Sequence, residues 1–464
     1  MKRFRSREAA ALAVLLLAAA ALRWPCLRGD LWLDEVWSVD LARGAKSLYG
    51  VVFGIRHDNS NPLNSLWLYL VADARDFAVF RLFSYACGLL CVAVLAVDPE
   101  DPPAGLLAGA LAATSAAMVL YSTEARGYAP MALFAVLCRR LLPPPGPLKP
   151  ARAAAFVGCA VLGFLSHSTF VFVFAGLGAW ALARYPRREW RSKLAALFVP
   201  VVALLAVHAV LRGGLEVGGA AVFPFLLVAA RTMILWSGAS GNGATAVLGM
   251  AALVYLPLRE IQRLRLRRDP EFWFHAVLLS SAVAFSLAFP FRAERHYFAV
   301  LPFVLILAAR GLLRMLRAAP FAKAAAVLLI AGFVLGNGLR IRALATEGRG
   351  HYLDALKRMA AETPGDVVTV GSDHKTRNTM LLEFYAPYLV PPKRVDHVTR
   401  DRMTETPPDW YLRHEIDSDL RYEPPELFFS STTAYRFVQS YPYAGMSGWI
   451  WLLYRREPPR PPSI

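Results

Sequence analysis

The chain has 464 residues, of which 56% are hydrophobic, and its mean hydropathy is +0.40. This composition excludes a soluble globule, because the apolar residues come in blocks of about 20, the length that crosses a bilayer. A transmembrane barrel is excluded too, since no stretch alternates apolar and polar residues over any length. The net charge of +17 does not indicate a nucleic-acid partner, because Lys and Arg lie in short clusters between the apolar blocks.

The N-terminal stretch has four basic residues before an apolar run at about 8–24. On its own, this pattern is typical of a secretory signal peptide. We interpret it as an uncleaved first span, because the chain continues as a multi-span protein. The basic residues then hold the N-terminus in the cytoplasm.

A long external loop is predicted to follow, from about residue 25 to residue 77. Its sequence LWLDEVWSVDLARG predicts a helix that lies on the membrane interface, and a second interfacial helix begins after the turn closed by Pro62. Asp34 and Glu35 are adjacent carboxylates among apolar and aromatic residues. Carboxylates at a membrane edge lose solvation, so we expect this pair to be bonded or used in chemistry.

The complete pattern predicts an all-α polytopic membrane protein with about 11 transmembrane helices. Arg-rich loops alternate with poorly charged ones, and each basic loop falls on the side of the N-terminus, as the positive-inside rule requires. An odd number of spans places the C-terminal part outside. The predicted basic loops are 139–152, 184–193, 259–268 and 310–323.

The C-terminal part differs in composition from the spans. GDVVTVGSDH, TAYRFVQSY and GWIWLLYRRE read as strands. We therefore predict two domains: a transmembrane domain over 1–340 and a small extracytoplasmic α/β domain over 341–464.

With this topology, the unusual polar residues of the spanning part gather on the external face. Carboxylates suit the abstraction of a proton from a hydroxyl, and arginines bind phosphate through paired hydrogen bonds. The combination indicates a lipid-phosphate-linked donor and an acceptor hydroxyl. The residues are Asp34, Glu35, Arg56, His57, Asp58, Glu124, Arg126, His167, Arg292, Glu294, Arg295 and His296.

A series of sequence blocks also resembles a known family. In order, they are WLDEVWSVDLA, NPLNSLWLYL, FRLFSYACGLL, YSTEARGYAPMALF, SHSTFVFVF and ERHYFAVLPFVLILAARG. They resemble membrane glycosyltransferases of the C-type fold, in particular the bacterial relatives of the protein O-mannosyltransferases and the lipid A aminoarabinose transferase. The resemblance covers about residues 8–320, and the YSTEARGYA block and the Asp-Glu pair are its most specific parts.

The resemblance implies a polyprenyl-phosphate-sugar donor, bound from the periplasmic side, and an inverting displacement that releases polyprenyl phosphate. It maps the base that acts on the acceptor to Asp34, and we expect Glu35 to orient or bind rather than to react. Residues expected to bind the donor phosphate are Arg126, Arg295, Arg56 and Tyr297. Residues expected to support the site are His57, Asp58, Glu124, His167, Arg292 and His296.

One block departs from the family pattern. Many relatives have His-Pro-Pro-Leu after the first loop, whereas this chain has Asn61-Pro62-Leu63-Asn64, with His57 four residues before Asn61. The acceptor class is therefore open. We predict no bound metal or other cofactor; the alternative of a divalent cation stays open, because carboxylate oxygens are available. These carboxylates belong to Asp34, Glu35, Asp58 and Glu124.

The sequence therefore predicts a glycosyltransferase in a bacterial inner membrane, with its N-terminus in the cytoplasm and its C-terminal domain in the periplasm or outside the cell. Its expected partners are a polyprenyl-phosphate sugar, the lipid bilayer and a protein, lipid or glycan acceptor. Two alternatives are a transporter or flippase for a lipid-linked glycan and a non-catalytic assembly partner. A transporter should carry ionisable residues at the midplane of its spans, and here the span interiors are nearly free of charge.

Overall fold

The computed structural model describes residues 6–98, 100–216, 223–239, 243–289, 293–415, 423–430 and 433–458. The chain forms two compact units. One is helical and comprises Met1–Leu27 and Leu41–Ile341, and the other comprises Arg28–Asp40 and Arg342–Ile464. The sequence predicts that Arg28–Asp40 belongs to the domain over 1–340, whereas the structure groups this segment with the C-terminal part.

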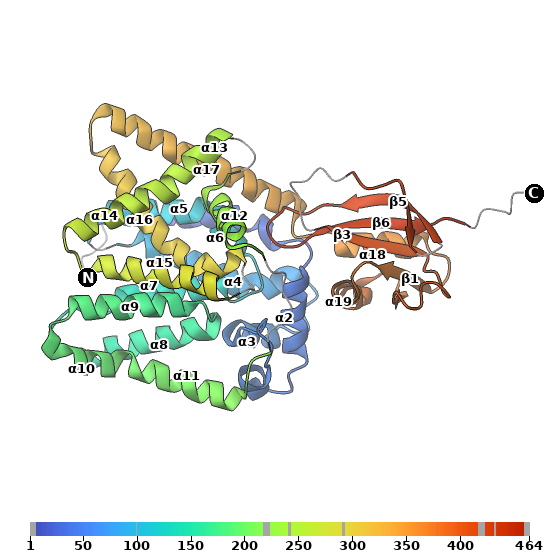
Figure 1. The fold of residues 1–464 in the computed structure, drawn as a ribbon, viewed down its shortest axis with the longest axis horizontal. Coiled ribbons are helices and arrows are strands. Elements are labelled where there is room, and N and C mark those ends of the chain that lie inside the picture. The colour runs from blue at the N-terminus through green and yellow to red at the C-terminus, as the bar shows by residue number, and fades with distance from the viewer. Residues whose placement is uncertain are drawn as a thin grey trace, which may run out of the picture. The chain divides into compact units, whose positions relative to one another are not determined.

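The helical unit consists of apolar helices, drawn from blue to light orange in Figure 1. Its elements are α1 (Ser6–Arg23), η1 (Pro25–Leu27), η2 (Gly50–Gly54), α3 (Pro62–Leu70), α4 (Phe77–Ala96), α5 (Pro102–Thr114), α6 (Ala116–Ser122), α7 (Tyr128–Leu141), α8 (Pro150–Ser166), α9 (Phe170–Arg184), α10 (Arg187–Leu197), α11 (Val199–Arg212), α12 (Phe225–Ser237), α13 (Gly243–Met250), η3 (Ala251–Tyr255), α14 (Leu256–Leu266), α15 (Glu271–Ala288), η4 (Glu294–Val300), α16 (Leu301–Leu316) and α17 (Pro320–Glu347).

In the described part of the chain, seven helical stretches are long and apolar enough to cross a membrane. An eighth candidate is the pair α5 and α6, which bends by 67°. The prediction of a multi-pass helical membrane protein is confirmed, and the count of eleven spans stays a prediction. The seven stretches are Glu8–Leu27, Phe77–Ala96, Arg187–Arg212, Gly243–Leu266, Glu271–Ala288, Glu294–Leu316 and Pro320–Glu362.

The bend between α5 and α6 is stabilised by side chains from two other helices. A break in a helix leaves backbone carbonyl and N–H groups without helical partners, which is costly away from water. The guanidinium of Arg23 donates to the carbonyl oxygens of Ala112 and Ala113, at 3.1 Å each. Oδ1 of Asn337 accepts from the N–H of Ala116 at 2.7 Å. Backbone groups on both sides of the break therefore have hydrogen-bonding partners, which stabilise the bend.

A second buried polar group connects three helices. Glu271 in the first turn of α15 pairs with Arg139 from the last turn of α7 and with Arg310 from α16. The distance from Nη1 of Arg310 to Oε2 of Glu271 is 3.0 Å. Breaking a buried pair costs several kcal/mol, about 3–5, because it leaves one charge uncompensated. These ion pairs therefore fix α7, α15 and α16 against one another.

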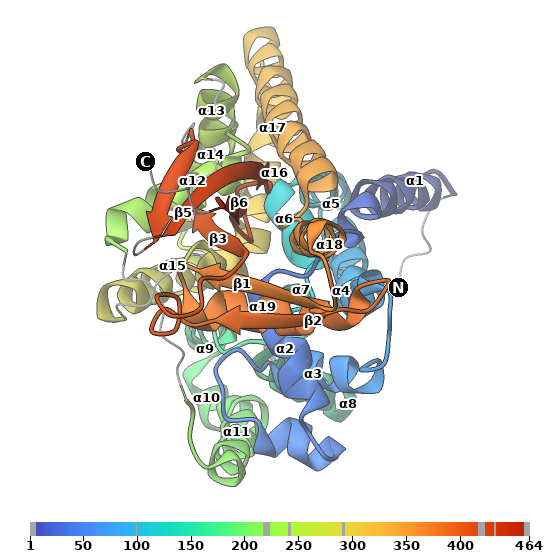
Figure 2. The ribbon, with the colours of Figure 1, turned by 90° about the vertical axis from the view of Figure 1, so that its right-hand side faces the viewer.

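The C-terminal unit contains a six-stranded sheet in the order β2-β1-β3-β6-β5-β4. β1 is second in this order and runs parallel to its neighbours β2 and β3, whereas the remaining pairs are antiparallel. Figure 2 shows β1 and β2 side by side. The predicted small C-terminal sheet is confirmed, including the strands β1, β5 and β6. The elements are α18 (Tyr352–Glu362), β1 (Val367–Ser372), α19 (Lys375–Tyr385), η5 (Ala386–Tyr388), β2 (Arg394–Val398), β3 (Trp410–Glu415), β4 (Leu427–Ser430), β5 (Thr433–Tyr441) and β6 (Ile450–Arg456).

The segment Arg28–Asp40 is attached to this unit by specific hydrogen bonds. The N–H of Leu353 donates to Oδ2 of Asp30 at 2.7 Å. The hydroxyl of Tyr385 donates to the carbonyl oxygen of Leu31 at 2.7 Å. These bonds place the start of α2 (Leu33–Arg43) on the C-terminal unit. Helices α2 and α3 lie within the predicted external loop, and their position at a membrane interface stays a prediction.

Candidate functional site

A short polar turn, residues 123–127, joins α6 to α7 and carries two of the predicted site residues. Buried side chains hold its backbone in place. Nδ2 of Asn64 donates to the carbonyl oxygen of Ala125 at 2.8 Å, and Oγ of Ser84 donates to that of Arg126 at 2.8 Å. The turn is therefore a rigid support, which a functional side chain requires.

Arg126 is almost completely buried, with 4% of its surface exposed. Its Nη1 donates to Oδ1 of Asn59, and its Nη2 donates to the hydroxyl of Tyr128 at 3.4 Å. The guanidinium also lies 5.6 Å from the centre of the Tyr128 ring. Asn59 and Tyr128 therefore hold the guanidinium in a defined orientation. Such a group is prepared to bind an anion.

His167, just after α8, lies close to basic side chains of the helical unit. Burial lowers the pKa of His167 well below its usual value, and the nearby His296, Arg126 and Arg295 lower this pKa further. Four predicted site residues are thus neighbours, although they come from three separate parts of the sequence. Burial is the main reason that His167 is neutral, and the positive charges of Arg126 and Arg295 that add to this effect also attract a phosphate.

The imidazole of His167 has a defined orientation. Its ring centre is 4.7 Å from that of Tyr128, and its Nδ1 accepts the backbone N–H of Thr169 at 3.2 Å. Because Nδ1 is an acceptor there, we assign the proton of the neutral ring to Nε2. Tyr128 therefore contacts both Arg126 and His167.

Arg295 and His296 lie at the start of η4 and are both half-buried. Nδ1 of His296 accepts the N–H of Ala293 at 3.2 Å. The hydroxyl of Tyr297, also on η4, donates to Oγ of Ser286 on α15. The predicted site residue Arg292 lies outside the described residues.

Glu124 is completely buried beside this group. Glu124 and Arg295, which is on η4, both lie within electrostatic reach of the phenol of Tyr121. Glu124 and Arg295 therefore share a neighbour at the end of α6. A buried carboxylate is stable only with compensating partners, so Glu124 fits a site that contains cations.

Arg56, His57 and Asp58 lie in a more open part of the helical unit. Arg56 and Asp58 are exposed. Nδ1 of His57 lies 3.1 Å from Oδ1 of Asp58 and accepts the N–H of Asn59 at 3.0 Å. The side chain of Arg212 at the end of α11 holds this loop, donating to the carbonyl oxygen of His57 at 3.0 Å. Through Asn59, the loop reaches Arg126.

The two carboxylates of α2, in the C-terminal unit, have different surroundings. Glu35 is completely buried, whereas Asp34 is half-buried. Oε2 of Glu35 accepts the N–H of Trp32 at 3.2 Å and lies 3.9 Å from Nε of Arg349, which is itself buried. These contacts give Glu35 a structural role. Asp34 is the more exposed residue of the pair.

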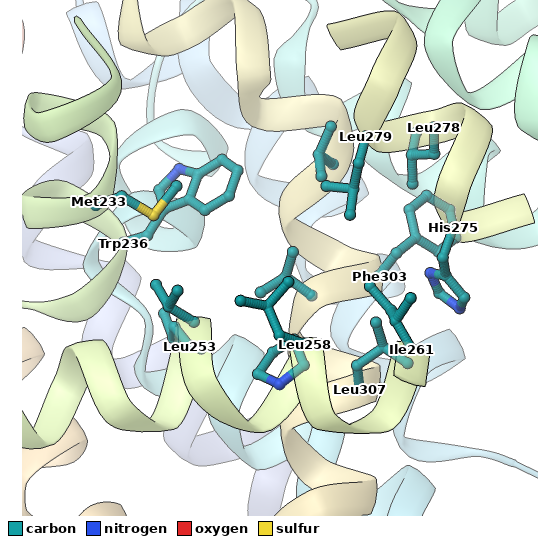
Figure 3. A pocket seen from close by; sticks show the side chains of 14 residues that line it. Met233, Trp236, Leu253, Leu258, Ile261, His275, Leu278, Leu279, Phe303 and Leu307 are labelled. Carbon is teal, nitrogen blue, oxygen red and sulfur yellow. The ribbon is translucent and has the colours of Figure 1, made fainter. Parts of the chain in front are cut away.

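An apolar cavity of about 160 Å³ lies between helices of the helical unit. Figure 3 shows side chains from α12, η3, α14, α15 and α16 facing it, with His275 as its polar member. Val300, the last residue of η4, also lines it. The same short helix therefore contributes to the cavity wall and carries Arg295 and His296.

Sequence reasoning missed several residues that build this site. Asn59 and Tyr128 hold the guanidinium of Arg126, and Asn64 and Ser84 hold its turn. The polar run DNSN, which includes Asn59, stands out between apolar segments and could have indicated a functional loop. The sequence alone does not show that Asn59 is buried. Among the described residues, no group of three or more His, Cys, Asp or Glu side chains is placed to hold a metal ion.

The chain is similar in structure to two solved membrane proteins. ArnT from Cupriavidus metallidurans in the apo state has a TM-score of 0.53 at 13% identity, over 88% of this chain and 93% of that chain. The same protein bound to undecaprenyl phosphate has a TM-score of 0.53 at 11% identity, over 96% and 97%. The oligosaccharyltransferase AglB from Archaeoglobus fulgidus, in complex with an inhibitory peptide and a dolichol-phosphate, has a TM-score of 0.52 at 11% identity, over 88% and 69%.

No protein-family model and no curated protein sequence matches the chain. The structural similarity nevertheless extends over most of its length. ArnT is the lipid A aminoarabinose transferase, and both ArnT and AglB have the same fold. The chain therefore has the C-type glycosyltransferase fold, as the resemblance of its sequence blocks predicted.

Proposed function

We propose that this protein is a membrane glycosyltransferase that moves a sugar from a polyprenyl-phosphate donor to an acceptor hydroxyl on the extracytoplasmic face. One observation carries the proposal: η4 carries Arg295, which like the buried Arg126 lies near His167, and the last residue of η4 lines an apolar cavity. A donor of this class has the two matching parts, a phosphate and a long apolar chain. The solved proteins of the same fold were bound to undecaprenyl phosphate and dolichol-phosphate, which supports this donor class.

Arg126 and Arg295 are the proposed ligands of the donor phosphate. Arginine suits this role because its planar guanidinium can donate two parallel hydrogen bonds to phosphate oxygens. The burial of Arg126 strengthens the interaction, since the effective dielectric constant is lower there. His167 and His296 are proposed as supporting residues, and Arg56 and Tyr297 stay predicted donor ligands with a weaker structural argument.

Asp34 is the proposed base. Its carboxylate takes the proton of the acceptor hydroxyl as the hydroxyl oxygen bonds to the anomeric carbon of the sugar. The bond between that carbon and the phosphate oxygen breaks, and polyprenyl phosphate leaves with the electron pair. Attack opposite to the leaving group inverts the anomeric centre. The greater exposure of Asp34, compared with the burial of Glu35, favours Asp34 for this role.

The proposal includes the topology that the sequence predicts. If α7, α8 and α9 also cross the membrane, the eight candidates become the eleven predicted spans. The basic loops then lie in the cytoplasm, and the C-terminal unit lies outside. We place the protein in the bacterial inner membrane.

The experiment is to incubate the purified protein in detergent with a panel of polyprenyl-phosphate sugars and candidate acceptors. Protein, lipid and glycan acceptors are tested separately. The expected result is release of free polyprenyl phosphate with one donor class, together with a glycosylated acceptor. Movement of an intact donor across a vesicle membrane, without its cleavage, would support a flippase and overturn the proposal.

A further inference from the structure

Glu35 caps the helix that bears the proposed base. Its Oε2 accepts the N–H of Trp32, the residue just before α2 begins at Leu33. A glutamate three residues after the N-cap commonly makes this bond and fixes the first helical turn. Asp34 lies within that turn, and its carbonyl oxygen accepts the hydroxyl of Ser38 at 2.8 Å. The place of the Asp34 backbone therefore depends on how Glu35 is held.

Arg349 is the charged partner of Glu35. The two side chains are 0% and 1% exposed, and Nε lies 3.9 Å from Oε2. Removing one member of such a buried pair leaves an uncompensated charge. The pair therefore fixes the position of the first turn of α2 within the C-terminal unit.

The backbone at Arg349 is itself fixed by the loop before β6. The hydroxyl of Tyr352 donates to the carbonyl oxygen of Arg349 at 2.9 Å, and the N–H of Trp449 donates to that hydroxyl at 3.3 Å. Gly448 packs so closely that a Cβ there would lie 1.8 Å from the carbonyl oxygen of Arg349. Arg349 therefore has little freedom to move.

We propose that Arg349 is a positioning residue for the transfer reaction: by pairing with Glu35, it fixes the first turn of α2 and aims the carboxylate of Asp34. This inference rests on the proposed function, in which Asp34 is the base. It gives the C-terminal unit a part in the chemistry, although its sheet carries none of the residues proposed to react. Arg349 acts through Glu35 and does not touch the reacting atoms.

The test compares Arg349→Met, Arg349→Lys and Glu35→Gln in the full-length protein. A misplaced catalytic group commonly costs about 100-fold in rate, so we expect kcat per folded molecule to fall about 10- to 100-fold in Arg349→Met. The KM for the donor should stay within about twofold, because the proposed donor ligands are elsewhere. Arg349→Lys keeps the charge and should recover part of kcat.

The double variant Glu35→Gln with Arg349→Met separates positioning from independent damage. If the two residues act as one unit, the double variant should be no slower than the slower single variant. Arg436→Ala is the matched control, because this exposed arginine pairs with Glu426 and Glu457 on the same unit. Its kcat should equal that of the unaltered protein.

The outcomes distinguish this inference from the proposed function. If the unaltered protein transfers sugar and Asp34→Asn does not, the function stands. Full kcat per folded molecule in Arg349→Met would then overturn the inference and leave Arg349 a purely structural residue. If Arg349→Met does not fold, full kcat in Glu35→Gln and in Arg349→Lys overturns it equally. Absence of transfer by the unaltered protein with every donor would instead refute the function.

Discussion

Gly127 packs directly against the main chain of Ser166, so that a Cβ at Gly127 would lie 1.8 Å from the Ser166 carbonyl oxygen. This approach brings the turn that carries Arg126 against the end of α8, next to His167. Gly127 has an ordinary negative φ of −77°, so the requirement for glycine here is a matter of space. The arrangement of the two site residues depends on this contact.

Gly127→Ala should displace the turn from α8. Overpacking in a close contact costs about 1–3 kcal/mol, and the backbone of Ser166 cannot rotate away as a side chain could. We expect a lower thermal midpoint in detergent and weaker donor binding. Gly158→Ala is the matched control, because nothing lies within 4 Å of a Cβ at this position on α8. Equal stability and donor affinity in the two variants would contradict the proposed packing.

Arg126→Ala should weaken donor binding. Hydrogen bonds to a charged group contribute about 1.5–3 kcal/mol, so the KM for the donor should rise about 10- to 100-fold. Arg126→Lys should recover little, since an ammonium cannot make the paired contacts of a guanidinium. Titration of the donor in the transfer assay measures both. Arg188→Ala, an exposed arginine on α10, serves as the control. An unchanged KM in Arg126→Ala would remove Arg126 from the donor site.

Asn337→Ala should destabilise the bend between α5 and α6. It removes the acceptor of the Ala116 N–H at a buried position, and an unsatisfied buried donor costs about 1–3 kcal/mol. The thermal midpoint of the purified protein should fall. Thr346→Ala on the same helix removes an exposed hydroxyl and should leave it nearly unchanged. If both variants have the same thermal midpoint as the unaltered protein, Asn337 is not needed for the bend.

The stability of the C-terminal unit should fall at acidic pH. Both ring nitrogens of His397 bond to hydroxyls, Nε2 to Ser372 at 2.9 Å and Nδ1 to Thr379 at 2.8 Å. Burial lowers the pKa of His397, and the charge of Lys375 lowers it further. As the pH falls through about 6.5, the ordinary pKa of histidine, His397 is therefore protonated in the unfolded chain before it is protonated in the folded protein. The stabilisation is present above that pH and is lost progressively below it.

Thermal midpoints at pH 7.5 and pH 5.5 measure this effect. His397→Gln keeps a polar side chain but cannot take up the proton, so its midpoint should change less between the two pH values. An identical change in the variant and the unaltered protein would show that other groups cause the pH dependence.

Much of the fold follows from local sequence patterns. Blocks of apolar residues predicted the membrane helices, and runs rich in β-branched and aromatic residues predicted β1, β5 and β6. Strand β4, LFFS, was not predicted and is only four residues long. Strands β2 and β3 were not predicted either: RVDHV and WYLRHE carry charged residues on one face of the strand and lack a clean apolar face on the other. These two segments are strands because each one pairs with β1, a contact that their own sequences do not indicate.

The candidate site was less accessible to sequence reasoning. The bond between Asp30 and Leu353 joins residues more than 300 positions apart, so no local pattern assigns the start of α2 to the C-terminal unit. Asp34 and Glu35 are adjacent in the chain, yet only Glu35 is completely buried. Their environments depend on distant residues such as Arg349. Charge-based topology grouped the polar side chains, whereas their hydrogen-bonding partners came only from the structure.

The transfer rate of Asp34→Asn, compared with that of the unaltered protein, tests the central claim most directly. Asparagine keeps the shape of the side chain but removes the base, so transfer from the polyprenyl-phosphate sugar should be abolished. The expression level, thermal midpoint and donor affinity should stay normal. Transfer by Asp34→Asn at a rate near that of the unaltered protein would contradict the account.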